Sequence, residues 1–183
     1  MASVLVPLAQ GCEELEAVTI IDLLVRAGIE VVSAGLESGP VHCSRGVTIL
    51  PETTLDEALK RDFDMLVLPG GQPGTDHLDA DPRIHQLLRR MAAEGKYTAA
   101  ICAAPKVLAS GGLLAGRRAT AYPGTLERLD LPETTVTTEP VIIDGNVITS
   151  RGPGTAMDFA LGLIEILLGH DKRIEVETAL QRP

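Results

Sequence analysis

The residue best placed to do chemistry is Cys102, which lies between an apolar run at Tyr97–Ile101 and a helix predicted from Pro105. Small residues flank it at Ala100 and Ala104, and they permit the sharp turn that raises a nucleophile above a sheet. Free N–H groups and the positive end of the following helix would favour thiolate over thiol. The alternative is a buried, inert cysteine at a strand end.

A second segment that could do chemistry is Pro69-Gly70-Gly71, which follows the apolar run Met65–Leu68. Glycine lets the backbone approach a ligand closely. An amide from this segment and the amide of Ala103 could both face an oxygen that develops negative charge. An ordinary glycine turn after a strand would explain the same residues.

Three acids, Glu13, Glu14 and Glu16, begin a helix predicted to run to Ala27. Interaction with the helix dipole explains most of this pattern. If one acid reached Cys102, two anions would repel, so the stable arrangement would be a protonated carboxyl that donates to a thiolate. That arrangement requires a raised Glu pKa. Spacing alone does not choose among the three acids.

The other cysteines and the histidines are too scattered to form a metal site or to serve a His-assisted hydrolase. No metal is therefore expected. Cys12 and Cys43 are predicted to be packing residues, although Cys12 could approach Cys102. The histidines, each expected to be solvated or capping, are His42, His77, His85 and His170.

The composition favours a buried parallel sheet covered by helices. Hydrophobic residues make up 45% of the 183 residues, with two Phe, two Tyr and no Trp, so the core must be aliphatic. One domain spanning 1–183 is expected. The net charge of -9 argues against a stable nucleic-acid partner. Three widely spaced cysteines, and no expected signal peptide or membrane span, favour the cytoplasm.

Hydrophobic periodicity and turn residues predict alternating strands and helices. Ligands sit beyond the carboxyl ends of parallel strands, so segments 11–16, 69–71 and 102–105 are expected at one edge. Hairpins are predicted within Val41–Leu50 and around Asp144-Gly145-Asn146. The predicted strands are Val4–Ala9, Ile29–Ala34, Met65–Leu68, Tyr97–Ile101 and Ala119–Ala121. The predicted helices are Glu13–Ala27, Thr54–Lys60, Asp81–Glu94, Pro105–Ser110 and one from Gly152-Pro153-Gly154 to Leu168.

With these residues in order, nearly the whole chain resembles the ThiJ/PfpI superfamily, specifically the branch of Parkinson's-disease-associated deglycases and bacterial chaperone-like proteins. The matching motifs are Gly11-Cys12-Glu13-Glu14-Leu15-Glu16, Arg26-Ala27-Gly28, Cys43-Ser44-Arg45, Leu68-Pro69-Gly70-Gly71, Ala100-Ile101-Cys102-Ala103-Ala104-Pro105 and Ser150-Arg151-Gly152-Pro153-Gly154-Thr155.

The resemblance implies an α/β, flavodoxin-like three-layer sandwich with a mostly parallel sheet, and a homodimer. It assigns the reactive thiol to Cys102 and its protonated partner to Glu16. It implies oxyanion donors at the Gly71 and Ala103 amides, with Gly70 beside them. No cofactor is implied, and the cysteine of this branch oxidises readily to a sulfinic acid.

Two departures from the pattern matter. Tyr122 stands where some relatives have His, which weakens any mechanism that needs an imidazole near Cys102. Ala103 stands where protease-like relatives have His, so peptidase activity is not expected. Amidotransferase relatives need a late His-Glu pair, and His170-Asp171 does not fit that requirement.

The leading hypothesis is a cysteine-dependent glyoxalase or deglycase that acts on methylglyoxal, glyoxal or their early protein adducts and protects against oxidative stress. The alternative is a redox-sensing holdase chaperone that binds unfolded proteins, uses oxidation of Cys102 and turns over little substrate. A third possibility, a ligand-binding flavodoxin-like module, lacks an obvious phosphate loop.

Overall fold

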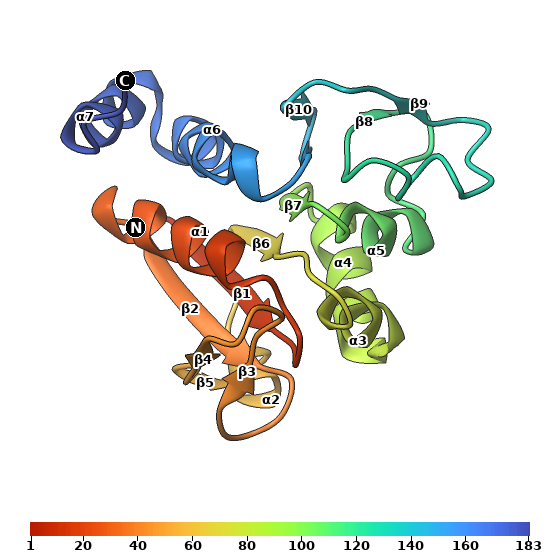
Figure 1. Ribbon diagram of the computed structural model, residues 1–183, viewed down its shortest axis with the longest axis horizontal. Coiled ribbons are helices and arrows are strands. Elements are labelled where there is room, and N and C mark those ends of the chain that lie inside the picture. The colour runs from red at the N-terminus through yellow and green to blue at the C-terminus, as the bar shows by residue number, and fades with distance from the viewer.

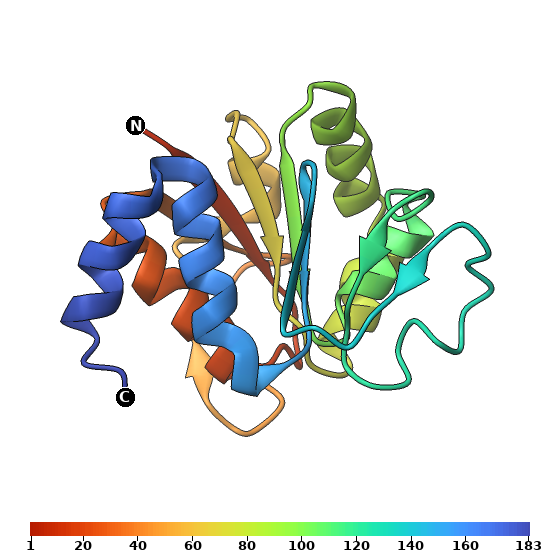
Figure 2. The same cartoon turned by 90° about the horizontal axis from the view of Figure 1, so that it is seen from above.

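The computed structural model describes residues 1–183 and places a seven-stranded sheet between two layers of helices (Figures 1 and 2). Every neighbouring pair of strands is parallel except β10 and β11. The predicted flavodoxin-like sandwich is confirmed. In spatial order the strands are β10 (Val141–Asp144), β11 (Val147–Ser150), β7 (Tyr97–Ile101), β6 (Met65–Leu68), β1 (Ser3–Leu8), β2 (Glu30–Gly35) and β5 (Thr53–Thr54).

The helices divide between the two faces because successive strand side chains point to opposite sides of the sheet. Val4 and Val6 pack in one apolar cluster, whereas Leu5 between them packs in the other. Figure 2 shows the two helical layers on either side of the strands. The first layer comprises α1 (Glu14–Arg26), α6 (Ala156–Leu168) and α7 (His170–Ala179). The second layer comprises α2 (Leu55–Ala58), α3 (Gly74–Ala80), α4 (Pro82–Ala93) and α5 (Pro105–Ser110).

Two small sheets and one short helix complete the structure. The antiparallel hairpin β3 (Val41–His42) and β4 (Thr48–Ile49) was predicted. The parallel pair β8 (Arg118–Ala119) and β9 (Thr135–Val136) lies in an outer lobe beyond β10. The short 3-10 helix η1 (Pro153–Thr155) precedes α6.

Local signals at helix ends were good predictors. The Thr54 side chain accepts a hydrogen bond from the Glu57 amide at 3.4 Å at the start of α2. Asp81 accepts from the Arg83 amide at 2.9 Å at the start of α4. Gly28 follows α1 with φ of +81°, a left-handed conformation that glycine adopts without strain.

Two helices were not predicted. α3 begins after Pro73 without a side-chain cap, and α7 buries only Val176, so neither carries a strong sequence signal. The strand predicted at Ala119–Ala121 is wrong by one residue at its start and two at its end, because it pairs with β9 only over Arg118–Ala119. None of the helices combines the length and the apolar character needed to cross a membrane.

Candidate active site

Cys102 occupies the sharp turn that its neighbours predicted. Its φ is +64°, a conformation that non-glycine residues seldom adopt. Its amide donates to the Ser150 carbonyl at 3.0 Å, and its carbonyl accepts from the Tyr122 amide at 2.8 Å. These two bonds hold Cys102 between β11 and the outer lobe. Such surrounding contacts are needed to keep a residue in a strained backbone conformation. The thiol side chain is 8% exposed.

The three predicted segments meet at one edge of the sheet. The Glu13 amide donates to the Gly70 carbonyl at 2.9 Å, and the Gly70 amide donates to Glu16 Oε2 at 2.8 Å. A Cβ on Gly70 would lie 2.7 Å from both Cys102 Cβ and Glu16 Oε2. The absent side chain of Gly70 is therefore what lets the acid and the thiol approach each other.

The three acids, which spacing could not separate, have three different tasks. Glu13 caps α1, because its Oε2 accepts from the Glu16 amide at 2.8 Å. Glu14 accepts from the amides of Arg45 at 3.0 Å and Val47 at 3.2 Å, which ties α1 to the β3–β4 hairpin. Burial alone would raise the Glu14 pKa, but these backbone donors outweigh it and lower the pKa. Of the three acids, only Glu16 affects the pKa of the Cys102 thiol.

Glu16 has the raised pKa that a proton-holding partner requires. Its side chain is fully buried, and this burial raises the pKa to about 7 against a lowering by the Gly70 amide and by Cys102. Glu16 Oε1 is buried and has no hydrogen-bond partner. The sulfur of Cys102 is thus the acceptor available to a protonated carboxyl at this position.

The thiol differs from its sequence-based expectation. Burial and the charge of Glu16 raise the Cys102 pKa to about 12, although the Ala103 and Gly71 amides oppose the rise. α5 is only six residues long, so the predicted helix dipole contributes little. The backbone amides lower the Cys102 pKa as expected, but they do not outweigh burial and the charge of Glu16. A thiolate costs less when Glu16 carries the proton, because repulsion is then replaced by a hydrogen bond.

A cavity of about 390 Å³ opens onto the sulfur. Tyr122 stands at its wall, half exposed, with its ring 3.3 Å from where a Cβ on Gly152 would lie. Glu16 does not line the cavity and reaches it only through Cys102. The lining residues are Glu13, Ser44, Arg45, Gly71, Gln72, Cys102, Ala103, Tyr122 and Pro153.

Sequence reasoning did not place Ser44, Arg45, Gln72 or Pro153 at this site. Ser44 and Arg45 come from the loop of the β3–β4 hairpin, and Pro153 begins η1. Three of these four residues lie in motifs that carried the family resemblance, and this was the signal that could have identified them. Gln72 follows Gly71 directly and had no signal beyond that position.

The histidines lie outside the cavity that opens onto Cys102. His77 contacts the Gln10 carbonyl at 2.9 Å, and His85 contacts the Asp79 carbonyl at 2.8 Å. His42 contacts Thr48 and His170 contacts Glu165. No group of three or more His, Cys, Asp or Glu side chains is arranged to hold a metal ion.

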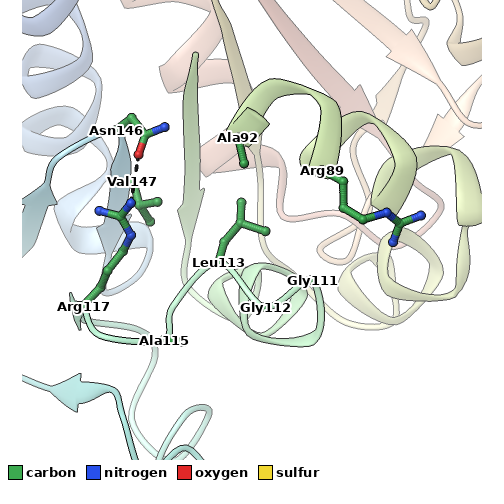
Figure 3. Close-up of a pocket in the computed structure, with 9 residues that line it drawn as sticks. All are labelled: Arg89, Ala92, Gly111, Gly112, Leu113, Ala115, Arg117, Asn146 and Val147. Carbon is green, nitrogen blue, oxygen red and sulfur yellow. Dashed lines mark hydrogen bonds between the residues drawn. The ribbon is translucent and has the colours of Figure 1, made fainter. Parts of the chain in front are cut away.

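A second cavity, of about 330 Å³, lies near Asn146 and Val147, at the strand edge opposite Cys102 (Figure 3). Its arginines do not converge on a ligand. Arg117 donates to Asn146 Oδ1 at 3.1 Å and pairs with Asp144, whereas the Arg89 guanidinium points away from Arg117. It holds no nucleophile.

Comparison with known proteins gives a consistent result. Residues 2–166 match the model of the DJ-1/PfpI family. The chain is 46% identical over 179 residues to Protein dj-1beta of Drosophila melanogaster, covering 97% of this chain and 96% of that protein. It is 37% identical over 171 residues to "Glutathione-independent glyoxalase DJR-1.2" of Caenorhabditis elegans, covering 93% and 90%. The crystal structure of Drosophila DJ-1beta superposes with a TM-score of 0.94 at 43% identity, covering 100% and 98%.

Gly70→Ala should lower the reactivity of the Cys102 thiol, although it adds only an apolar methyl group. The added methyl would lie 2.7 Å from Cys102 Cβ and Glu16 Oε2, so one of them must move. A displacement of this size lowers the alkylation rate of Cys102 by about 100-fold, as iodoacetamide labelling would measure. Gly154→Ala is the matched control, because no atom lies within 4 Å of its added Cβ. An unchanged labelling rate in Gly70→Ala would contradict this geometry.

Glu16 should also make stability depend on pH. Its folded pKa of about 7 exceeds its ordinary value of 4.5, so its stabilising contribution is complete below pH 4.5 and is lost as pH rises through 7. The free energy of unfolding should fall by about 3 kcal/mol across this window. Urea denaturation should show the fall in the wild type and not in Glu16→Gln.

Glu14→Gln is the control for the pH experiment. The Glu14 pKa is lowered, so its stabilising contribution is present above the ordinary value and is lost in acid. This variant should alter stability only in the acid range and keep the fall near pH 7. An equal slope in wild type and Glu16→Gln would show that Glu16 is not the titrating group.

Proposed function

The chain belongs to the DJ-1/PfpI family, and on that premise we propose that it is a cofactor-independent glyoxalase-type enzyme whose nucleophile is Cys102. The observation that carries the proposal is the buried Glu16, whose carboxyl lies beside Cys102 at the position where Gly70 has no side chain. A carboxyl with a pKa of about 7 can both accept and return a proton at neutral pH.

The proposed reaction begins with transfer of the thiol proton from Cys102 to Glu16. The thiolate then attacks the aldehyde carbon of methylglyoxal, and the carbonyl oxygen becomes an alkoxide. The amides of Gly71 and Ala103 lower the Cys102 pKa, and both residues line the cavity, so we assign the oxyanion to these two donors. Glu16 is fully buried and does not line the cavity, so water protonates the alkoxide, and Glu16 keeps the thiol proton until the thiolate leaves and takes it back.

The second half of the reaction converts the adduct to a 2-hydroxy acid. A proton moves from the former aldehyde carbon to the ketone carbon through an enediol, which leaves a thioester on Cys102. Glu13 lines the cavity and is the acid placed to carry this proton. Water then cleaves the thioester, so that methylglyoxal and one water give lactate and the free thiol. Glyoxal gives glycolate by the same steps.

The open cavity of about 390 Å³ has room for a small 2-oxoaldehyde and for its early adduct on a protein side chain, which is the deglycase form of the activity. Removal of such aldehydes protects a cell under oxidative stress. All three cysteines are free thiols, a state that a reducing cytoplasm maintains, and we propose that the protein acts there.

The rival function uses the same residues. A sulfinic acid on Cys102 would receive hydrogen bonds from the Ala103 and Gly71 amides and from protonated Glu16, so the site can also stabilise an oxidised cysteine. In that case the protein would be a redox-sensing holdase for unfolded proteins, with little turnover. The rate at which the protein converts methylglyoxal to lactate distinguishes the two functions.

Lactate formation from methylglyoxal should require both Cys102 and Glu16. Cys102→Ala should abolish turnover, and Glu16→Gln should lower it by about 100-fold because proton transfer is lost. The Glu16→Gln variant should still be alkylated at Cys102, since an amide can replace the protonated carboxyl as a hydrogen-bond donor. An enzymatic lactate assay and iodoacetamide labelling measure the two effects.

The matched control is Cys43→Ala, which removes a cysteine that is 8% exposed, as Cys102 is. Its turnover should stay within about twofold of wild type. Full lactate production by Cys102→Ala would end the enzymatic proposal. If no variant turned over aldehyde and peroxide-treated wild type suppressed aggregation of an unfolded client, the holdase function would replace it.

We also propose that the protein is a homodimer joined through an apolar patch on α1 and the β3–β4 hairpin. Leu15, Val18 and Val25 recur on one side of α1 and are half exposed. Glu14 ties this helix to the hairpin, whose Val47 and Leu50 are 50% and 75% exposed. Exposed apolar side chains gathered on one surface mark an association site.

Val18→Asp should convert the dimer to a monomer, because it would place a charge within the proposed interface. Light scattering coupled to gel filtration would measure the mass. Ile143→Asp is the control, since Ile143 is 53% exposed and lies outside the proposed interface, on the edge strand β10. Dissociation by Ile143→Asp and not by Val18→Asp would locate the interface elsewhere.

A further inference from the structure

Cys12 and Cys43 form a buried pair of thiols that the sequence did not predict. Their sulfur atoms lie 3.6 Å apart, although the residues are 31 positions apart in the chain. Cys12 is fully buried, Cys43 is 8% exposed, and both are free thiols. A disulfide bond would bring the sulfurs to about 2.05 Å, so closure requires a movement of roughly 1.5 Å.

The segments that carry the two thiols are already joined by backbone hydrogen bonds. The Gly11 amide donates to the His42 carbonyl at 2.8 Å, and the Ser44 amide donates to the Cys12 carbonyl at 2.8 Å. Because these bonds lie beside the two cysteines, they already hold the two backbone segments next to each other, as a disulfide would require. Cys43 also follows β3, in a two-stranded sheet separate from the seven-stranded one, so the closing movement need not disturb the central sheet.

The pair stands directly behind the wall of the cavity. Ser44 and Arg45, which follow Cys43, line the cavity, as does Glu13, which follows Cys12. Gly71 approaches this segment closely, since a Cβ there would lie 2.7 Å from the Cys12 carbonyl carbon. A cross-link would therefore fasten two segments of the cavity wall to each other.

We propose that Cys12 and Cys43 are a second redox site, which closes an intramolecular disulfide under peroxide and clamps the β1–α1 loop to the β3–β4 hairpin. The inference does not depend on the aldehyde chemistry of Cys102. It concerns two thiols that the proposed reaction does not use.

The chemistry balances with hydrogen peroxide as the oxidant. The Cys43 thiolate attacks one peroxide oxygen, the O–O bond breaks, and a sulfenic acid and hydroxide form. The Cys12 sulfur then attacks the Cys43 sulfur, forms the S–S bond and displaces hydroxide. The two thiol protons convert the two hydroxides to water, so two thiols and one peroxide give one disulfide and two waters.

The surroundings determine which thiol reacts first. Cys43 is the more exposed, and its hydrogen bond with Cys12 lowers its pKa, although burial raises it overall. Burial and Cys43 raise the Cys12 pKa far above its ordinary value, so Cys12 keeps its proton until it resolves the sulfenic acid. Both thiols are therefore slow to react, and closure is expected under sustained rather than brief oxidation.

The cross-link can be measured by peptide mapping. Wild type and Cys102→Ser are treated with peroxide, their free thiols are alkylated in denaturant, and the proteins are digested without reductant. The expected product in both is a Cys12 peptide joined to a Cys43 peptide, lighter by two hydrogens. The melting temperature of oxidised Cys102→Ser should rise by roughly 5 °C or more and return on reduction with dithiothreitol.

Cys43→Ser is the matched control and should lose both the cross-link and the rise in melting temperature. Because the main measurement uses unsubstituted Cys12 and Cys43, it does not depend on how well a cysteine variant folds. Cys12 and Cys43 that remain alkylatable at doses that fully oxidise Cys102 would overturn the proposal, as would a link between Cys12 and Cys102. A cross-link without a rise in melting temperature would contradict the clamp.

Discussion

The proposed site depends on a single proton that Glu16 and Cys102 would share. Burial raises the pKa of both groups, to about 7 and about 12, so neither readily becomes an anion beside the other. With the proton on Glu16, the sulfur is a nucleophile that accepts one hydrogen bond from the acid and others from two amides. With the proton on sulfur, the group is an ordinary buried thiol. Reactivity is therefore set by the location of this proton within the pair, and the backbone around it serves to keep the two groups in contact.

That contact explains several features of the fold that would otherwise look unrelated. Gly70 carries no side chain where one would separate the acid from the thiol, and its amide and carbonyl both bond to the start of α1. The strained φ of Cys102 is held from two sides by Ser150 and Tyr122. Strain of this kind costs about 1–3 kcal/mol and persists because the aliphatic core and the ladder of parallel strands supply a larger stabilisation. The central sheet thus fixes a geometry that an isolated loop could not hold.

Sequence reasoning reached the architecture and placed Cys102 at a turn between a strand and a helix, because both depend on local signals. Alternating apolar runs located the strands, and the N-cap residues Thr54 and Asp81 correctly predicted where α2 and α4 begin. It did not find α3 or α7, which lack a strong cap or a wide apolar face. It could not distinguish Glu13, Glu14 and Glu16, since their tasks depend on segments that are distant in the chain. It also missed the raised Cys102 pKa and the contact between Cys12 and Cys43, because burial and long-range proximity are properties of the folded chain.

The two cysteine sites differ in the group beside the reacting thiol that can accept its proton. Cys102 has a buried carboxyl as its neighbour, and this carboxyl can take the thiol proton without releasing it from the site. Cys43 has another thiol as its neighbour, and Cys12 is a much weaker acid that offers no such reservoir. Cys102 should consequently respond to electrophiles at low concentration, and the Cys12–Cys43 pair only when oxidant persists. The cavity would then have a fast-reacting thiol, Cys102, for turnover and a slow-reacting pair, Cys12 and Cys43, for protection. Their rates of reaction would differ because Glu16 is a much stronger acid than the Cys12 thiol.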